Sequence, residues 1–177
     1  MLPARKKLEL FFWSCVPPFI TLLFLVAYLA PKHISGLAQF MPLLHMIPIY
    51  FWGLTHARDM PYLFVFALGL VVDAISGQPM GLSSLMNVLF LVLIHAQYKY
   101  IYKEGFVVKW GYFAGMLGIY AGAHWAVLFV FFSQSHGFWT ALLQWLLTAC
   151  CYPFFHLWFD RLHQHITQQR WQLLHGR

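Results

Sequence analysis

Long apolar segments separated by short polar ones dominate this 177-residue sequence, and they constrain its fold more than any other feature. A helix needs about 20 residues to cross the hydrocarbon core of a bilayer. Segments close to this length occur at about 8–30, 34–54, 61–76, 81–97, 108–132 and 138–159. The sequence therefore predicts an all-α integral membrane protein with about six transmembrane helices in a single transmembrane domain, 1–177.

The scarcity of charged residues supports this class. Only 9% of the residues are Asp, Glu, Lys or Arg and 61% are hydrophobic, whereas a soluble domain has about 25% charged and 45–50% apolar residues. An ordinary soluble globular protein is therefore excluded, and a disordered chain would need low hydrophobicity with high net charge. Six spans leave fewer than about 60 residues for tails and loops, so no separate domain outside the membrane is expected.

The basic residues fall on one side of the predicted spans. If the amino terminus is cytoplasmic, all of the 11 Lys and Arg residues except Lys32 lie on the inner side. Because inner loops of membrane proteins are enriched in Lys and Arg, both termini are expected in the cytoplasm, with 160–177 as an interfacial tail. The net charge of +6 is then a topology signal, and its scatter over several segments argues against nucleic acid as a partner.

The ten histidines do not form a convincing metal site. His156 and His163 lie two helical turns apart, about 10 Å along the helix axis, which is too far to chelate one ion. No Cys or acidic residue completes a ligand pattern around them. His45, His95 and His124 lie within or at the ends of spans, where hydrogen bonds to neighbouring helices are expected. We predict no metal, no cofactor and no catalytic residue.

Asp73 is the one acidic residue that lies deep inside a predicted span, beyond the bilayer midplane, whereas the other four lie near the inner face. A carboxylate at the centre of a span costs roughly 2.5–3.5 kcal/mol, so its presence needs a reason. Gly69, Asp73 and Gly77 share one helical face, Pro79 ends that helix, and Gly81 precedes the next. The carboxylate can accept N–H groups at the start of the following helix and so lock an outer hairpin. A contact with a partner protein or a proton-linked role is the alternative.

The fifth predicted span carries a row of small residues. Small side chains at every fourth position let another helix approach closely. The row could pack inside this protein or receive the spanning helix of another protein, and the spacing does not decide between them. Its members are Ala114, Gly118, Gly122 and Ala126, beside a parallel row of Gly111 and Gly115.

The stretch from Pro48 to Leu85 resembles the rod shape-determining protein MreD family. The most recognisable part is the pattern G-L-x-x-D-x-x-x-G-x-P-x-G-L, which begins at Gly69. The end of the chain also fits, with Phe138-Trp139 leading into Tyr152-Pro153-Phe154-Phe155 and a basic tail. The other matching positions are Tyr50-Phe51-Trp52, Arg58-Asp59-Met60-Pro61 and Phe66-Ala67-Leu68.

This resemblance implies a component of the cell-elongation machinery in the bacterial cytoplasmic (inner) membrane. Such proteins are similar in fold to the substrate-binding subunits of energy-coupling-factor transporters, and they pair with the membrane protein MreC. They link MreB filaments to the glycosyltransferase RodA and a class B penicillin-binding protein, which build lateral peptidoglycan. The resemblance carries over Gly69, Asp73, Gly77, Pro79 and Gly81 as motif positions and implies no active site. We therefore expect a non-enzymatic scaffold.

Two other functions stay open at this stage. A substrate-binding subunit of a vitamin or metal uptake transporter would share the fold and explain a buried Asp73. It would need a polar, outward-facing pocket, whereas the predicted outer loops are short. A membrane enzyme or proton relay is the third reading, but a single intramembrane carboxylate lacks the acid–base partner that such chemistry needs.

Overall fold

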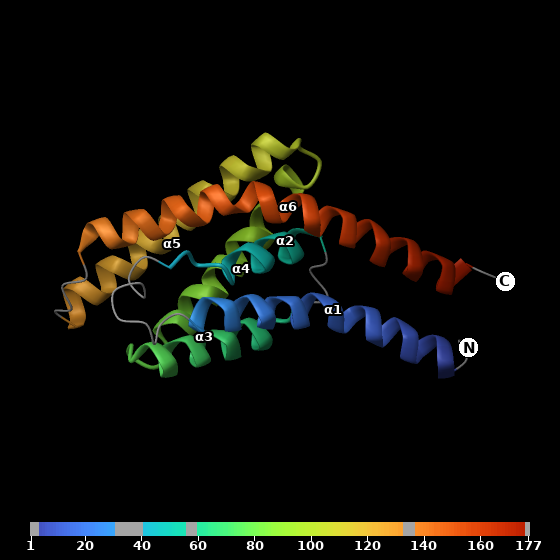
Figure 1. Ribbon diagram of the computed structural model, residues 1–177, viewed down its shortest axis with the longest axis horizontal. Helices are drawn as coiled ribbons and strands as arrows, with labels where there is room; N and C mark the ends of the chain where they lie inside the picture. Colours follow the sequence, from blue (N-terminus) through green and yellow to red (C-terminus); the bar gives the residue numbers. More distant parts are fainter. Residues whose placement is uncertain (1–3, 31–40, 56–59, 133–136, 176–177) are drawn as a thin grey trace.

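The computed structural model of the protein describes residues 4–30, 41–55, 60–132 and 137–175. These residues form six helices that run in alternating directions along the long axis of the molecule, and both chain ends lie at the same end (Figure 1). The helices are α1 (Ala4–Leu29), α2 (Met46–Thr55), α3 (Tyr62–Ser76), α4 (Leu82–Ile101), α5 (Phe106–Phe132) and α6 (Phe138–His175).

Four of these helices are long and apolar enough to cross a membrane. The qualifying segments are Phe12–Leu29, Leu82–Ile101, Phe106–Phe131 and Phe138–Gln169. Large apolar side chains such as Leu63, Phe131 and Phe154 are at least 74% exposed. Such an exterior would be a liability in water but matches the hydrocarbon of a bilayer. The structure thus confirms an all-helical protein suited to a membrane.

The short helix α2 forms the centre of the bundle. It lies between α1 and α6 (Figure 1), and every residue from Met46 to Leu54 is buried. A helix that is apolar on all sides is suited to such a position. Of the predicted span 34–54, residues 41–45 precede the helix, and 34–40 lie outside the described residues. Ten residues reach about 15 Å, half of a hydrocarbon core.

The last helix is longer than the sixth predicted span. The residues expected as an interfacial tail continue α6 without a break to His175. Ile166 is fully buried, and the His165 ring lies 5.8 Å from the ring of Trp13 on α1. Burial of Ile166 against the core explains why this segment stays with the bundle.

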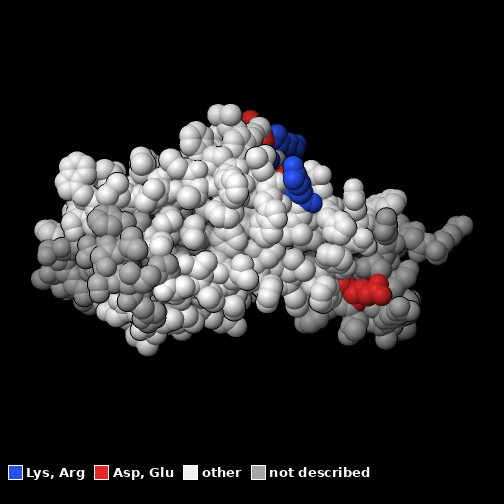
Figure 2. Space-filling model, in the orientation of Figure 1, with Lys and Arg blue, Asp and Glu red and all other residues white. Residues whose placement is uncertain are grey.

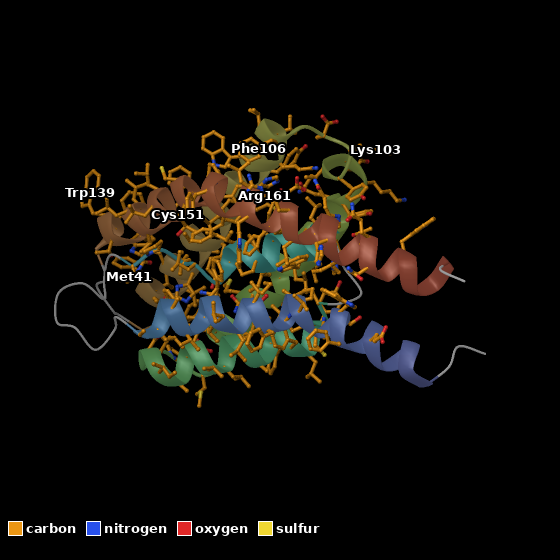
Figure 3. The ribbon with its side chains drawn as sticks, turned by 45° about the vertical axis from the view of Figure 1, so that its right-hand side comes forward. Met41, Lys103, Phe106, Trp139, Cys151 and Arg161 are labelled. Atoms are coloured by element: carbon orange, nitrogen blue, oxygen red, sulfur yellow. The ribbon has the colours of Figure 1, made fainter. Side chains whose placement is uncertain are left out.

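On the face in Figure 2, the coloured charged side chains lie between the middle of the molecule and the end that carries both termini. The left half of this face shows no Lys, Arg, Asp or Glu among the coloured residues. Lys103 lies toward the terminus-bearing end and Trp139 toward the opposite end (Figure 3). Lys32 and Arg58, which belong to the predicted charge pattern, lie outside the described residues.

Candidate functional site: the α3–α4 hairpin

The hairpin between α3 and α4 begins with a sharp helix end. Gly77 adopts a left-handed backbone conformation (φ 64°), and its N–H donates to the carbonyl of Asp73. The N–H of Gln78 donates to the same carbonyl at 3.2 Å. Glycine is favoured in this conformation because it has no Cβ to clash with the backbone. Pro79 then follows at a position where the helix has already ended.

The Asp73 carboxylate joins the end of α3 to the start of α4. Its Oδ2 accepts the N–H of Gly81 at 2.8 Å, and its Oδ1 accepts the N–H of Ser83 at 3.0 Å. The first N–H groups of a helix have no partner within the helix, and the helix dipole favours negative charge there. Asp73 has no exposed surface. The contacts expected from the sequence are present, and they explain how a carboxylate is accommodated in this apolar protein.

Gly69 lies one turn before Asp73 and brings the two helices into backbone contact. A Cβ at this position would overlap the Cα of Ser84, and it would lie 2.5 Å from its N and 2.8 Å from the carbonyl carbon of Ser83. Real Cβ atoms do not approach backbone atoms so closely, so α3 and α4 can pack this way only with glycine at 69. The close packing places Asp73 within reach of the α4 amino terminus.

The start of α4 carries polar residues whose role the sequence pattern did not identify. Ser83, Ser84 and Asn87 are all buried. The Asn87 Oδ1 accepts a hydrogen bond from the Tyr120 hydroxyl of α5 at 3.0 Å, and the Ser83 hydroxyl donates to the Gln78 Oε1 at 3.3 Å. Three polar residues on neighbouring turns of one span are the signal that could have located this network.

The row of small residues on α5 is divided between two environments. The Trp145 indole N–H of α6 donates to the carbonyl of Ala114 at 2.8 Å, and a Cβ on Gly118 would lie 3.2 Å from the same nitrogen. This half of the row packs within the protein. Gly122 is exposed, with open space around a Cβ, and Ala126 is half-buried.

A cavity of about 290 Å³ lies beside the hairpin, toward the end of the molecule opposite Lys103. Its walls come from α1, α3, α4, α5 and α6 and from the residues just before α2. Polar members of the lining include Ser76, Gln78, Ser83, Tyr120, His124 and Gln144. No Asp, Glu, Lys or Arg is among the described residues that line it. Asp73 itself is not in the lining, although its neighbour Val72 is.

The expected hydrogen bond to a neighbouring helix is present at His95, whereas His45 and His124 contact tyrosine rings. The Tyr62 hydroxyl is 2.6 Å from His95 Nδ1, the His45 ring lies 4.8 Å from the Tyr28 ring, and His124 stacks on Tyr120. Within the described ranges, no three His, Cys, Asp or Glu side chains are arranged to hold a metal ion.

Four long apolar helices, two of the six joined by a carboxylate that caps the second, suit a helical protein of a membrane. The sequence matches the family model of the rod shape-determining protein MreD over residues 7–162. The chain therefore belongs to the MreD family, which confirms the expected family and makes the protein a membrane component of rod-shape determination. No curated protein and no solved structure matches the chain.

Proposed function

We propose that this protein is a non-enzymatic scaffold in the inner membrane, where it pairs with MreC and supports lateral peptidoglycan synthesis. The family match over residues 7–162 is the observation that carries this proposal. Through the same complex the protein would associate with RodA, a class B penicillin-binding protein and MreB filaments. The proposal includes a fold related to the substrate-binding subunits of energy-coupling-factor transporters.

The proposed topology has six crossings with both termini in the cytoplasm. The alternating helix directions and the shared position of the chain ends support it (Figure 1). In this arrangement the segment that contains α2 crosses inside the bundle, because α1, α4 and α6 pack around it, and α3 crosses as a shorter helix. The exposed Lys103 and Arg161 then face the cytoplasm, in agreement with the enrichment of basic residues on the inner side.

The exposed glycines of α5 are the proposed contact for the spanning helix of MreC. Gly111, Gly115 and Gly122 are exposed, and a Cβ at any of them would meet nothing within 4 Å. They lie within about 40° of one another around the helix, so they form one flat strip. In lipid, helices associate by close packing, and a strip without side chains permits this.

The Asp73 hairpin supports this scaffold from within. Both carboxylate oxygens accept backbone N–H groups, and the side chain is fully buried, so the carboxylate is used inside the chain. We propose that Gly69, Asp73, Gly77, Pro79 and Gly81 fix the hairpin, and that any partner contact here is made by its exposed tip at Met80.

A transporter subunit for a vitamin or metal is the second candidate, and the cavity is the observation that favours it. Among the described residues the lining offers no carboxylate to a metal, which favours an uncharged small molecule. Depletion of the protein in its host would then abolish uptake of one nutrient while the cells stay rod-shaped.

Co-purification tests the pairing. The full chain, carrying an affinity tag at its carboxyl terminus, is extracted from host membranes in a mild detergent, and MreC is measured in the eluate. We expect MreC in stoichiometric amounts. MreC at the level of an unrelated inner-membrane protein of similar abundance would contradict the proposal.

A further inference from the structure

The cavity beside the α3–α4 hairpin is not needed for a scaffold that works by helix packing alone. A packed interior has few voids larger than a water molecule, whereas this half-open cavity reaches about 290 Å³. Ligand cavities run from about 300 to 1,000 Å³ for drug-sized molecules. The space therefore suits a single ring with its substituents.

The described part of the lining disfavours charged ligands. No described residue in the walls carries a charge, and the nearest carboxylate, Asp73, uses both oxygens on backbone N–H groups. An ion in this site would lose its hydration without gaining a counter-charge. A phosphate, a carboxylate or a metal ion is thus disfavoured, and an uncharged polar molecule remains.

Two hydroxyl groups in the walls are fixed so that they present acceptors. The Tyr120 hydroxyl donates its proton to Asn87, and the Ser83 hydroxyl donates to Gln78. Each hydroxyl has one proton and two lone pairs, so its oxygen can still accept a hydrogen bond. A ligand that matches them must itself carry O–H or N–H donors. The side-chain amide of Gln78 lies in the same lining.

Aromatic rings form one wall of the cavity. The rings of Tyr120 and His124 lie nearly parallel, 11° apart with centroids 6.0 Å apart, and Trp125 follows on the same helix. Flat rings of this kind can stack against the apolar face of a saturated ring while polar groups bind its rim. Fixed acceptors beside an aromatic wall suit a sugar ring.

We propose that this cavity binds an uncharged, hydroxyl-rich ring: a neutral sugar, presented either free or as the headgroup of a lipid. Asp73 contributes to this binding indirectly. Its carboxylate accepts the backbone N–H of Ser83 and so positions the Ser83 hydroxyl, one of the two acceptors. The two sources share the same chemistry at the site and differ only in whether an acyl chain is attached.

Native mass spectrometry of the full chain in nanodiscs tests the proposal. The protein is prepared without glycoside detergents, since their sugar headgroups would compete. The probes are methyl α-glucoside, a monoglucosyl diacylglycerol in the nanodisc lipid, and glucose 6-phosphate as the charged control. We expect saturable binding of a neutral probe and no binding of the phosphate. Binding of the glucoside indicates a free sugar, and binding of the glycolipid alone indicates a headgroup; either supports the proposal.

Tyr120→Phe removes one acceptor while it keeps the ring, and Tyr112→Phe on the exposed inner part of α5 is the matched control. The first variant should weaken binding by at least about threefold, as expected for one lost hydrogen bond, and the second should not. Ser83→Ala makes the same test if Tyr120→Phe does not fold. No saturable binding of either neutral probe, equal binding of glucose 6-phosphate, or unchanged binding by both acceptor variants would overturn the proposal.

Discussion

Asp73 on α3 and Ser83 on α4 are joined by a buried hydrogen bond in which the carboxylate Oδ1 accepts the Ser83 N–H at 3.0 Å. A second bond from Gly81 to Oδ2 completes the cap of α4. The hairpin is thus held by an interaction between one helix's side chain and the next helix's backbone. These N–H groups lie at the start of α4, where the helix itself offers them no partner, so the carboxylate supplies one.

Replacing Asp73 should lower stability without preventing insertion. Asp73→Asn keeps the size but turns one of the two acceptors into a donor that faces an N–H group. We expect the free energy of unfolding to fall by about 1–3 kcal/mol, and to fall further for Asp73→Leu. Unfolding in mixed micelles by increasing sodium dodecyl sulfate fraction measures this.

Asp160→Asn is the matched control, because Asp160 is only half-buried and its oxygen accepts from Gln164 at 3.2 Å. Its stability should stay close to that of the unchanged protein. Normal stability of Asp73→Asn together with complete loss of rod shape would point instead to a role that depends on the charge.

Gly69→Ala should separate α3 from α4. The added methyl group would overlap the backbone of Ser84, and backbone cannot move aside as a flexible side chain can. Overpacking of this kind costs about 1–3 kcal/mol. Gly111→Ala makes the same chemical change at an exposed helical site and should leave stability unchanged or raise it by up to about 1 kcal/mol. Equal melting behaviour of the two variants would show that the close approach at Gly69 is not required.

Large side chains introduced on the two faces of α5 should have different effects on MreC binding and on protein abundance. The double variant Gly115→Leu/Gly122→Leu places two large side chains on the exposed strip. It should reduce the amount of co-purified MreC several-fold, while the abundance of the variant itself stays normal. Gly118→Leu would press on Trp145 instead and should lower abundance. Ala74→Leu adds the same bulk on the exposed face of α3 and serves as the control. Full recovery of MreC with the double variant would remove this strip from the interface.

Chemical labelling of introduced cysteines tests the topology. Met80→Cys lies at the hairpin tip and Lys103→Cys on the α4–α5 connection, and both positions are exposed. With Cys15, Cys150 and Cys151 replaced by serine, a membrane-impermeant maleimide should label position 80 in intact spheroplasts and position 103 only after lysis. The reverse pattern would invert the proposed orientation.

The α3–α4 hairpin could be predicted from sequence because its signals are local. Gly69, Asp73 and Gly77 share a face, and Pro79 and Gly81 mark the turn, so the spacing favours a contact between the carboxylate and the next helix, while it leaves a partner contact of Asp73 open. Membership of the MreD family was also predictable, since the same residues carry the resemblance.

Features set by distant parts of the chain could not be predicted in this way. The segment that contains α2 is apolar on all sides, and such a pattern suits a helix in lipid as well as a helix buried in protein. The pattern therefore does not reveal a short central helix. Spacing also does not show how α5 is rotated about its own axis relative to its neighbours. That rotation places Gly118 against Trp145 and leaves Gly122 on the exterior. The cavity needs residues from five helices and appears in no single segment.

Controlled depletion of the protein in its rod-shaped host, followed by measurement of cell width and length, tests the scaffold function most directly. Rods should widen and become round within a few generations, and the unchanged gene should restore them. Cells that keep their rod shape after the protein is gone, above all if uptake of one nutrient is lost, would contradict the account.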